Sequence, residues 1–179
     1  MHKPLPTQEY LLTRLSYNQE TGFFQWLKKE EKTKADKTWN IKFSGKPAAI
    51  AWSENSYRRI CIDGFHYQAN RIAWRIHTGE DPGDLVIDHI DRNKQNDAIS
   101  NLRKATYSEN QANRPAQSNN ANGAKGVYWH ARDKKWIARV FVKKKCIELG
   151  RYSTISEAEK AATEGRERVF GEFANHSGA

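Results

Sequence analysis

The spacing of apolar residues predicts a series of short elements in the first half of the chain. Residues 7–15 place their apolar side chains on one helical face, and Thr7 is suited to cap that helix. Residues 15–29 then indicate a hairpin around a Glu-Thr-Gly turn. A stronger hairpin signal follows at Asp63-Gly64, because this pair accepts the positive φ of a tight turn.

Apolar spacing then predicts a short helix over residues 71–77, ended by Gly79 and Pro82. Its apolar side chains are expected to be mostly buried. The tryptophans of the first half are also expected in the core rather than at a binding surface: Trp26, Trp39, Trp52 and Trp74.

The second half of the chain carries a different pattern. Residues 114–126 are polar and rich in turn formers, which indicates a linker. Beyond them, three alternating runs predict strands, at residues 127–131, 136–142 and 146–152. A helix follows, with Ser156 and Glu159 at the spacing of a capping box.

Composition narrows the class of partner. The chain has 179 residues, enough for one large or two small domains, and 30 Lys and Arg against 21 Asp and Glu give a formal net charge of +9. This excess favours a nucleic acid over a membrane, because no apolar run approaches the roughly 20 residues of a spanning helix. Cys61 and Cys146 form no zinc motif and are expected to be ordinary strand residues. The N-terminus lacks the order of a secretory signal, so a cytoplasmic protein is expected.

Candidate chemistry follows the apolar run that ends in Asp88 and His89. Residues 85–91 indicate a strand, whose regular form would point these two side chains to opposite faces. Residues 101–106 indicate its partner strand, and a helix capped by Ser108 is expected next.

These residue types suit hydrolysis of a phosphodiester. His89 can serve as a general base for water, and Asp88 can hold a divalent cation that offsets the developing negative charge. Asn110 on the following helix offers a neutral amide oxygen to that cation. Asn101 could hydrogen-bond either the loop or the far nitrogen of His89.

The stretch DHIDRNKQNDAISNLRKATYSENQANR, residues 88–114, resembles the ββα-metal core of HNH endonucleases. It matches the phage and homing branch, in which asparagine replaces the last histidine. The resemblance implies that His89 is the general base, that Asp88 and Asn110 are metal ligands and that Asn101 is the middle asparagine. Few protein ligands and no thiolate favour Mg²⁺ or Mn²⁺.

Asn70 departs from this pattern. The upstream hairpin and helix also resemble those of HNH proteins, but Asn70 stands where the family usually has a histidine. If that histidine only supports the fold, the change costs little. If it positions the metal or the scissile phosphate, Asn70 weakens or abolishes activity.

Residues 125–175 are similar to the AP2/ERF DNA-binding domain, on the segments GV, KWIARV, LGRYST and GEFAN and an alanine-rich helix. The resemblance implies a three-stranded sheet in the major groove of DNA with the helix behind it. The residues expected near DNA are Tyr128, His130, Arg132, Trp136, Arg139, Lys145 and Tyr152, with Arg103 from the preceding region.

Together these features predict an α+β protein. N-terminal β-hairpins and a helix lead into a ββα-metal HNH core, and a three-stranded antiparallel sheet backed by one helix follows. The expected domains are residues 1–113 for the endonuclease, with its core at about residues 58–113, a linker at 114–125 and an AP2-like domain at 126–179.

The predicted function is a site-recognising endonuclease of double-stranded DNA. One active site per chain cuts one strand, so a monomer should nick and a double-strand break would need a homodimer or a second encounter. Two alternatives stay open: a DNA-binding regulator that keeps an inactive HNH scaffold, and an RNA-directed enzyme.

Overall fold

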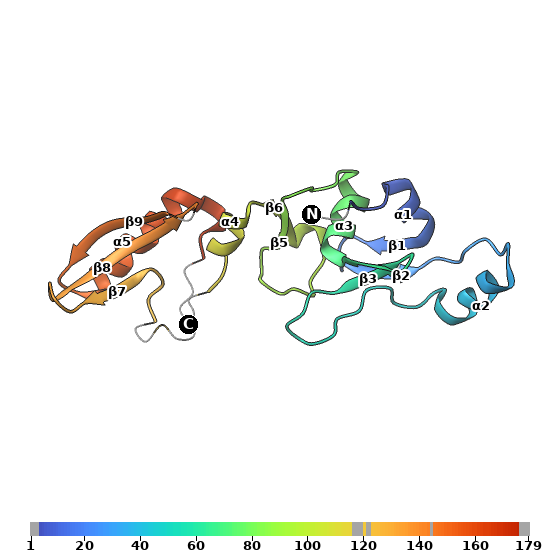
Figure 1. Cartoon of the computed structure of the whole chain (residues 1–179), viewed down its shortest axis with the longest axis horizontal. Coiled ribbons are helices and arrows are strands. Elements are labelled where there is room, and N and C mark those ends of the chain that lie inside the picture. The colour runs from blue at the N-terminus through green and yellow to red at the C-terminus, as the bar shows by residue number, and fades with distance from the viewer. Residues whose placement is uncertain (1–3, 116–119, 121–122, 144, 176–179) are drawn as a thin grey trace. The chain divides into compact units, whose positions relative to one another are not determined.

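A computed structural model of the chain describes residues 4–115, 120, 123–143 and 145–175. The chain divides into two compact units, residues 1–104 and 105–179, coloured blue to green and yellow to red in Figure 1. Each unit combines helices with small sheets, which confirms the predicted α+β class. The division falls before residues 107–112, which the sequence grouped with the first domain.

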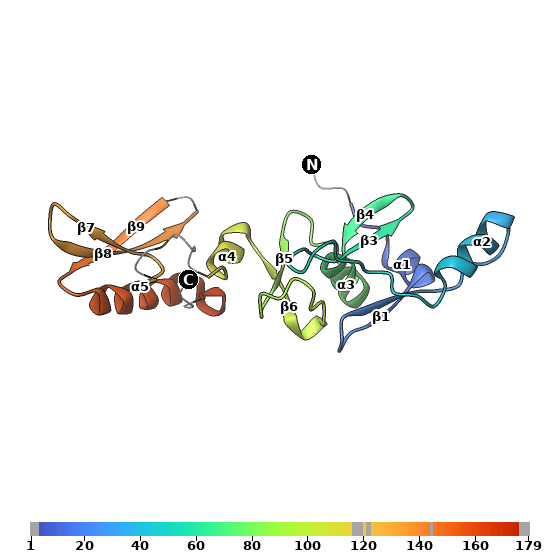
Figure 2. The same cartoon turned by 90° about the horizontal axis from the view of Figure 1, so that it is seen from below.

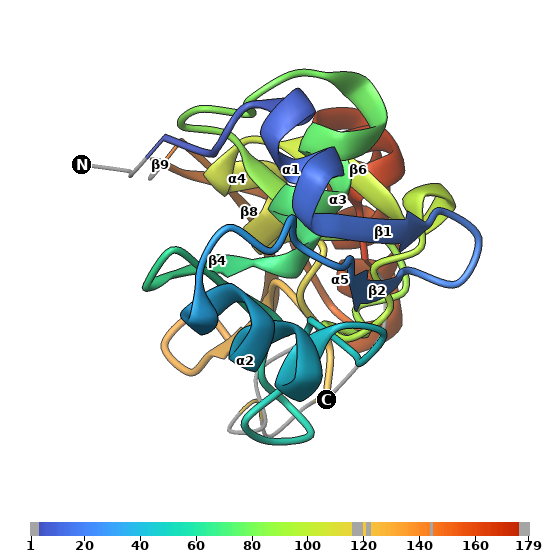
Figure 3. The ribbon, with the colours of Figure 1, turned by 90° about the vertical axis from the view of Figure 1, so that its right-hand side faces the viewer.

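A helix and a hairpin open the first unit, as predicted. Thr7 caps α1 (Gln8–Arg14) by accepting a backbone hydrogen bond from the first turn. β1 (Leu15–Asn18) and β2 (Phe23–Trp26) pair antiparallel around a turn that contains Gly22. α1 lies beside β1 (Figure 3).

The second hairpin and the helix after it are also confirmed. β3 (Arg59–Ile62) and β4 (Phe65–Gln68) pair antiparallel, and Asp63 and Gly64 have φ values of 50° and 79° in the turn. These positive values are those of a tight hairpin turn. The following helix, α3 (Ala69–Thr78), starts two residues earlier than predicted.

The hydrophobic core of the first unit lies between α1, the two hairpins and α3. Gly79 ends α3 in the left-handed conformation, as predicted. Within the helix Ile72 is fully buried, whereas Trp74 and Ile76 are partly buried at the edge of the core. The central side chains of this core are Leu11, Leu15, Phe24, Ile60, Ile62 and Ile72.

Two features of the first unit differ from the sequence predictions. α2 (Lys34–Phe43) was not predicted, because its sequence has few apolar residues; it attaches through Trp39, whose ring meets Trp26 edge-on at 5.4 Å. Trp52 was predicted in the core, but it is 71% exposed. Trp52 lies in an irregular loop, where its ring meets His66 edge-on at 5.9 Å and the Arg59 guanidinium at 5.1 Å rather than the core.

The end of the first unit carries the expected strand pair. β5 (Val86–His89) pairs with β6 (Leu102–Ala105) in a two-stranded sheet. The connection between them is a polar loop followed by the short 3₁₀ helix η1 (Ile99–Asn101). The predicted order of strand, long polar loop and strand is therefore confirmed.

The second unit contains the predicted three-stranded sheet and helix. β7 (Val127–His130), β8 (Lys135–Val142) and β9 (Lys145–Tyr152) form an antiparallel meander. Figure 2 shows α5 (Ile155–Phe170) along one face of this sheet. The core between them includes Val127, Ala138, Ala158 and Ala162.

Two further helical elements belong to the second unit. α4 (Tyr107–Ala112) packs against α5 and against the 3₁₀ helix η2 (Gly171–Phe173). Among the described residues, no helix is long and apolar enough to cross a membrane.

The helix caps of this unit were predicted two residues too late. α4 is capped by Thr106 with Glu109, and α5 by Thr154 with Glu157, each pair forming a full capping box. Ser108 and Ser156 lie inside the first turn instead. For α5 the predicted and the observed pairs both satisfy the three-residue spacing, so the spacing alone does not determine which hydroxyl caps the helix.

Candidate active site

β5 delivers Asp88 and His89 to a buried position at the end of the strand. Their exposed fractions are 6% and 3%. Asp88 Oδ2 accepts a hydrogen bond from Arg103 Nε of β6 at 3.1 Å, and His89 Nε2 lies 2.9 Å from Asp97 Oδ1 in the loop. The two side chains therefore have different charged partners, as strand alternation predicts.

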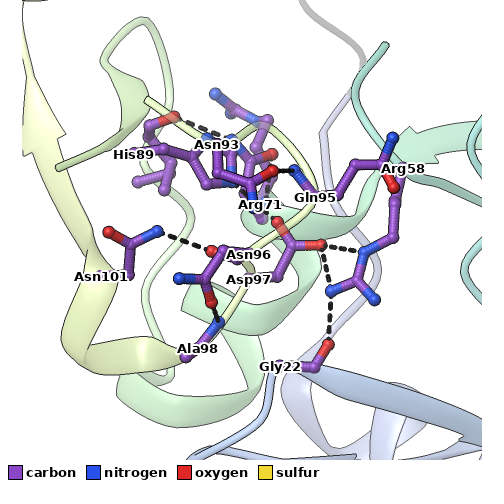
Figure 4. A network of polar contacts seen from close by, with 12 residues as sticks. Gly22, Arg58, Arg71, His89, Asn93, Gln95, Asn96, Asp97, Ala98 and Asn101 are labelled. Carbon is purple, nitrogen blue, oxygen red and sulfur yellow. Dashed lines mark hydrogen bonds and ion pairs between the residues drawn. The ribbon is translucent and has the colours of Figure 1, made fainter. Parts of the chain in front are cut away.

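Asp97 was not identified from the sequence, although it is a charged partner of His89. Its carboxylate is 1% exposed and also accepts a hydrogen bond from Arg58 Nε at 2.9 Å (Figure 4). Arg58 comes 39 residues earlier in the chain, so no local pattern links the two. The ring of Tyr57 lies 5.7 Å from that of His89.

The N-terminal hairpin supports the backbone of Asp97. Tyr17 Oη donates to the Asp97 carbonyl oxygen at 2.8 Å, and Arg58 donates to the Gly22 carbonyl oxygen at 2.7 Å. Burial, together with the nearby Asp97 carboxylate, raises the pKa of Tyr17, so its hydroxyl keeps the proton that it donates. A side chain at Gly22 would place a Cβ 2.3 Å from the carbonyl carbon of Asp97.

Asn101 organises the loop rather than the far nitrogen of His89. Its amide nitrogen donates to Asp91 Oδ1 at 2.9 Å and to the Asn96 carbonyl oxygen at 2.8 Å, and its oxygen accepts from the Asp91 backbone. Asn96 donates to the other Asp91 oxygen at 2.7 Å. Partial burial alone would raise the pKa of Asp91, but these hydrogen bonds lower it below its ordinary value.

Asn93 completes this network of amide side chains. Its backbone N–H donates to Asp91, and its side-chain oxygen accepts from the Gln95 backbone at 3.1 Å. Asn93, Asn96 and Asn101 thus share a structural task, because they close the loop between β5 and η1 (Figure 4).

Asn70 supports the strand that carries Asp88. It is 2% exposed, its amide nitrogen donates to the Ile87 carbonyl oxygen at 2.8 Å, and its oxygen accepts from the Arg71 backbone at 2.9 Å. Asn70 therefore holds the backbone of β5 at Ile87, one residue before Asp88.

Arg103 is placed differently from its predicted role. It was expected to contact DNA, but its side chain is 12% exposed and paired with Asp88. Asn110 lies on α4 in the second unit, so its role as a second metal ligand remains a prediction.

The donor chemistry at Asp88 suits a hard divalent cation. Carboxylate oxygens are ligands for Mg²⁺, which keeps several waters and takes few protein ligands. Within the described ranges, no group of three His, Cys, Asp or Glu side chains could hold a metal. A cation here would therefore depend on Asp88, on an amide oxygen and on water or phosphate oxygens.

In the second unit, the sheet face away from α5 carries a cationic and aromatic cluster. Arg139 lies between two rings, with its guanidinium carbon 4.4 Å from the centroid of Tyr128 and 5.1 Å from that of Phe141. Arg132 and Lys145 are exposed, and His130 lies 3.3 Å from Asp133.

Two predicted DNA contacts lie on the other face of that sheet. Trp136 and Tyr152 pack, partly buried, against the core cluster beneath α5. Trp136 also faces Trp129 at 5.2 Å between ring centroids. Trp136 and Tyr152 are paired across β8 and β9, so their side chains lie on the same face of the sheet, which is the face toward α5. They are therefore not part of the cluster around Arg139.

Comparisons with known proteins support the resemblance seen at the site. Residues 67–112 match the family model for HNH endonucleases, a range that contains Asp88, His89, Asn101 and Asn110. The chain is 38% identical to Protein 3.8 of Escherichia phage T7 over 68 residues, which is 38% of this chain and 56% of that protein. It is 35% identical over 96 residues to an uncharacterized HNH endonuclease of Acanthamoeba polyphaga mimivirus, covering 54% of this chain and 49% of that protein.

The chain thus spans about half the length of the curated relatives it matches. The HNH match covers the segment from β4 to α4 and leaves out the three-stranded sheet and α5. No solved structure matches the chain.

Proposed function

We propose that this chain is a divalent-metal-dependent endonuclease that hydrolyses phosphodiesters of double-stranded DNA. The observation that carries the proposal is that the consecutive residues Asp88 and His89 are both buried at the end of β5, within the segment that matches the HNH family model. A net charge of +9 supports a polyanionic substrate.

His89 takes the proton from the attacking water in this proposal. A histidine is suited to that role because imidazole changes charge near neutral pH. Asp88 and Asn110 would hold the cation, Mg²⁺ or Mn²⁺, and the cation would supply positive charge to offset the negative charge that develops in hydrolysis. Arg103 orients Asp88 and compensates its buried charge, since it donates to the same carboxylate.

The second unit provides affinity for DNA and the choice of site. The cluster of Arg139, Tyr128 and Phe141 supports this role, because a guanidinium held between rings is fixed in orientation and can contact a base edge or a phosphate. Arg132, His130 and Lys145 extend the same basic region. Trp136 and Tyr152 are not part of this proposed surface, because both pack against the core on the side of the sheet that faces α5.

One active site per chain implies that a monomer nicks. A break in both strands then needs a homodimer or a second binding event.

A plasmid assay tests the function. Supercoiled DNA with Mg²⁺ should become nicked by the wild type and remain supercoiled with His89→Ala, while DNA binding is retained. His77→Ala is the matched control, because His77 is an exposed histidine of α3. Equal nicking by the wild type and His89→Ala would overturn the proposal.

A DNA-binding regulator is the second candidate, and Asn70 is the observation that favours it. If Asn70 has removed a catalytic histidine, the wild type binds plasmid without cutting it. Asn70→His should then restore cutting. Nicking by the wild type contradicts the regulator directly.

A further inference from the structure

The carboxylate of Asp97 lies between a permanent cation and the candidate general base. Arg58 approaches Oδ2 at 2.9 Å, and His89 Nε2 approaches Oδ1 at 2.9 Å. The side chains of Asp97 and His89 are 1% and 3% exposed, so water does not screen this chain of contacts. Arg58 compensates the buried negative charge, which would otherwise carry a large desolvation cost.

This arrangement selects one tautomer of His89. An ionised carboxylate only accepts hydrogen bonds, so the proton of a neutral imidazole must sit on Nε2. The lone pair is then on Nδ1, which is the nitrogen able to take a proton from water. An acid that holds the far ring nitrogen in this way fixes both the tautomer and the orientation of the ring.

Residues outside the HNH match hold the carboxylate in place. The match begins at residue 67, whereas Arg58, Tyr17 and Gly22 come earlier in the chain. Tyr17 bonds the Asp97 carbonyl, and the Gln19 carbonyl accepts from the backbone N–H of Ile99 at 2.9 Å. The close approach of Gly22 to Asp97 fixes the same segment from the other side. The N-terminal hairpin therefore bears directly on the position of Asp97.

We propose that Asp97, clamped by Arg58 and the N-terminal hairpin, is a positioning residue that presents Nδ1 of His89 as the basic nitrogen. The inference rests on the proposed role of His89 as the base. This positioning role differs from a purely structural one. A structural Arg58–Asp97 pair would hold the loop without determining which imidazole nitrogen of His89 carries the proton.

The variant Asp97→Asn distinguishes a positioning role of Asp97 from a purely structural one. An asparagine has one oxygen and one NH₂ group, and Arg58 requires the oxygen as its acceptor. The NH₂ group then faces His89 Nε2 and donates to it, which moves the imidazole proton to Nδ1. The variant keeps the size of the side chain but reverses the tautomer.

The experiment is long-range ¹H–¹⁵N NMR of full-length protein with ¹⁵N-labelled histidine. The His89 signals are assigned by their loss in His89→Ala. The expected result is a proton on Nε2 in the wild type and on Nδ1 in Asp97→Asn, with the rest of the spectrum unchanged. Asp84→Asn is the matched control, since it makes the same chemical change at an exposed aspartate before β5, and its tautomer should be that of the wild type.

Nicking rates give a second readout. In Asp97→Asn, kcat should fall by at least about 100-fold with little change in KM, whereas Asp84→Asn should keep the wild-type kcat. A wild-type proton on Nδ1, or the same tautomer in wild type and Asp97→Asn, would overturn the inference. If the wild type fails to nick at all, the proposed function fails, but the tautomers still decide whether Asp97 positions the ring.

Discussion

The charged side chains of the two candidate sites are held in different ways. In the first unit Asp88, His89 and Asp97 are each less than a tenth exposed, and each has a charged side-chain partner. In the second unit Arg132 and Lys145 lie at the surface, and Arg139 lies against the faces of two rings. Buried, paired groups are preorganised for chemistry, whereas exposed cations suit the long-range attraction of a polyanion.

The two units should also differ in how strongly they respond to substitutions. A change in the buried network leaves a charge without its partner in a medium that screens it poorly. A change on the exposed sheet face removes one of several contacts that salt already weakens. Substitutions should therefore have large effects on rate or stability in the first unit and modest effects on affinity in the second.

The largest effect is expected at Asp88. Asp88→Asn removes the carboxylate proposed to hold the cation and should slow Mg²⁺-dependent nicking by about a thousandfold, about 4 kcal/mol in the barrier. Asp84→Asn, an exposed aspartate before β5, should leave the rate unchanged. Rates measured over a range of Mg²⁺ concentrations check this, and equal rates for both variants would remove Asp88 from the mechanism.

Loss of Asp97 should cost stability as well as rate. Asp97→Ala leaves Arg58, whose side chain is 16% exposed, without its carboxylate, and should lower the free energy of unfolding by about 3 kcal/mol. Urea denaturation measures the change. A loss below about 1 kcal/mol would mean that water reaches this pair and that the buried and exposed networks are less different than the fold implies.

Alanine variants of two glycines test whether the N-terminal hairpin packs closely on the Asp97 segment. Gly22 and Gly45 have φ values of 68° and 77°, but a Cβ at Gly45 has open space, whereas one at Gly22 would meet the backbone of Asp97 and Ala98. Both alanine variants bear the strain of positive φ, and Gly22→Ala should cost about 2 kcal/mol more because the loop must move. Thermal denaturation of both proteins compares them. Equal losses would show that the hairpin does not press on the Asp97 segment.

The smallest effect is expected on the exposed sheet face. Arg139→Ala should weaken DNA binding by about 1 kcal/mol, roughly fivefold, and reduce the slope of log affinity against log salt by about one if Arg139 contacts a phosphate. Arg168→Ala, an exposed arginine on α5, is the control for net charge. The same loss in both variants would mean that the sheet face has no special part in binding.

Local signals in the sequence predicted most of the fold. The Asp63-Gly64 turn, the Thr7 cap and the Gly79 stop each depend on residues within a few positions, and the structure has all three. The alternating runs of the second unit likewise became β7, β8 and β9. By contrast, α2 and the exposure of Trp52 depend on which surfaces remain to be covered, and no local pattern encodes that.

The site was predictable only in part, for the same reason. Asp88 and His89 follow from the strand and the polar loop after it. The partnership of His89 with Asp97 depends on Arg58 and Tyr17, which reach residue 97 from 39 and 80 positions away. Asn101 was expected to bond either the loop or His89, and the structure shows it engaged within the loop, together with Asn93 and Asn96.

The most direct test of the central claim is a crystal structure of the His89→Ala variant with duplex DNA and Mg²⁺. The proposed function predicts one cation at the scissile phosphate, with oxygens of Asp88 and Asn110 both at about 2.1 Å. A cation bound elsewhere, or bound by Asp88 with Asn110 remote from it, would contradict the proposed hydrolytic site.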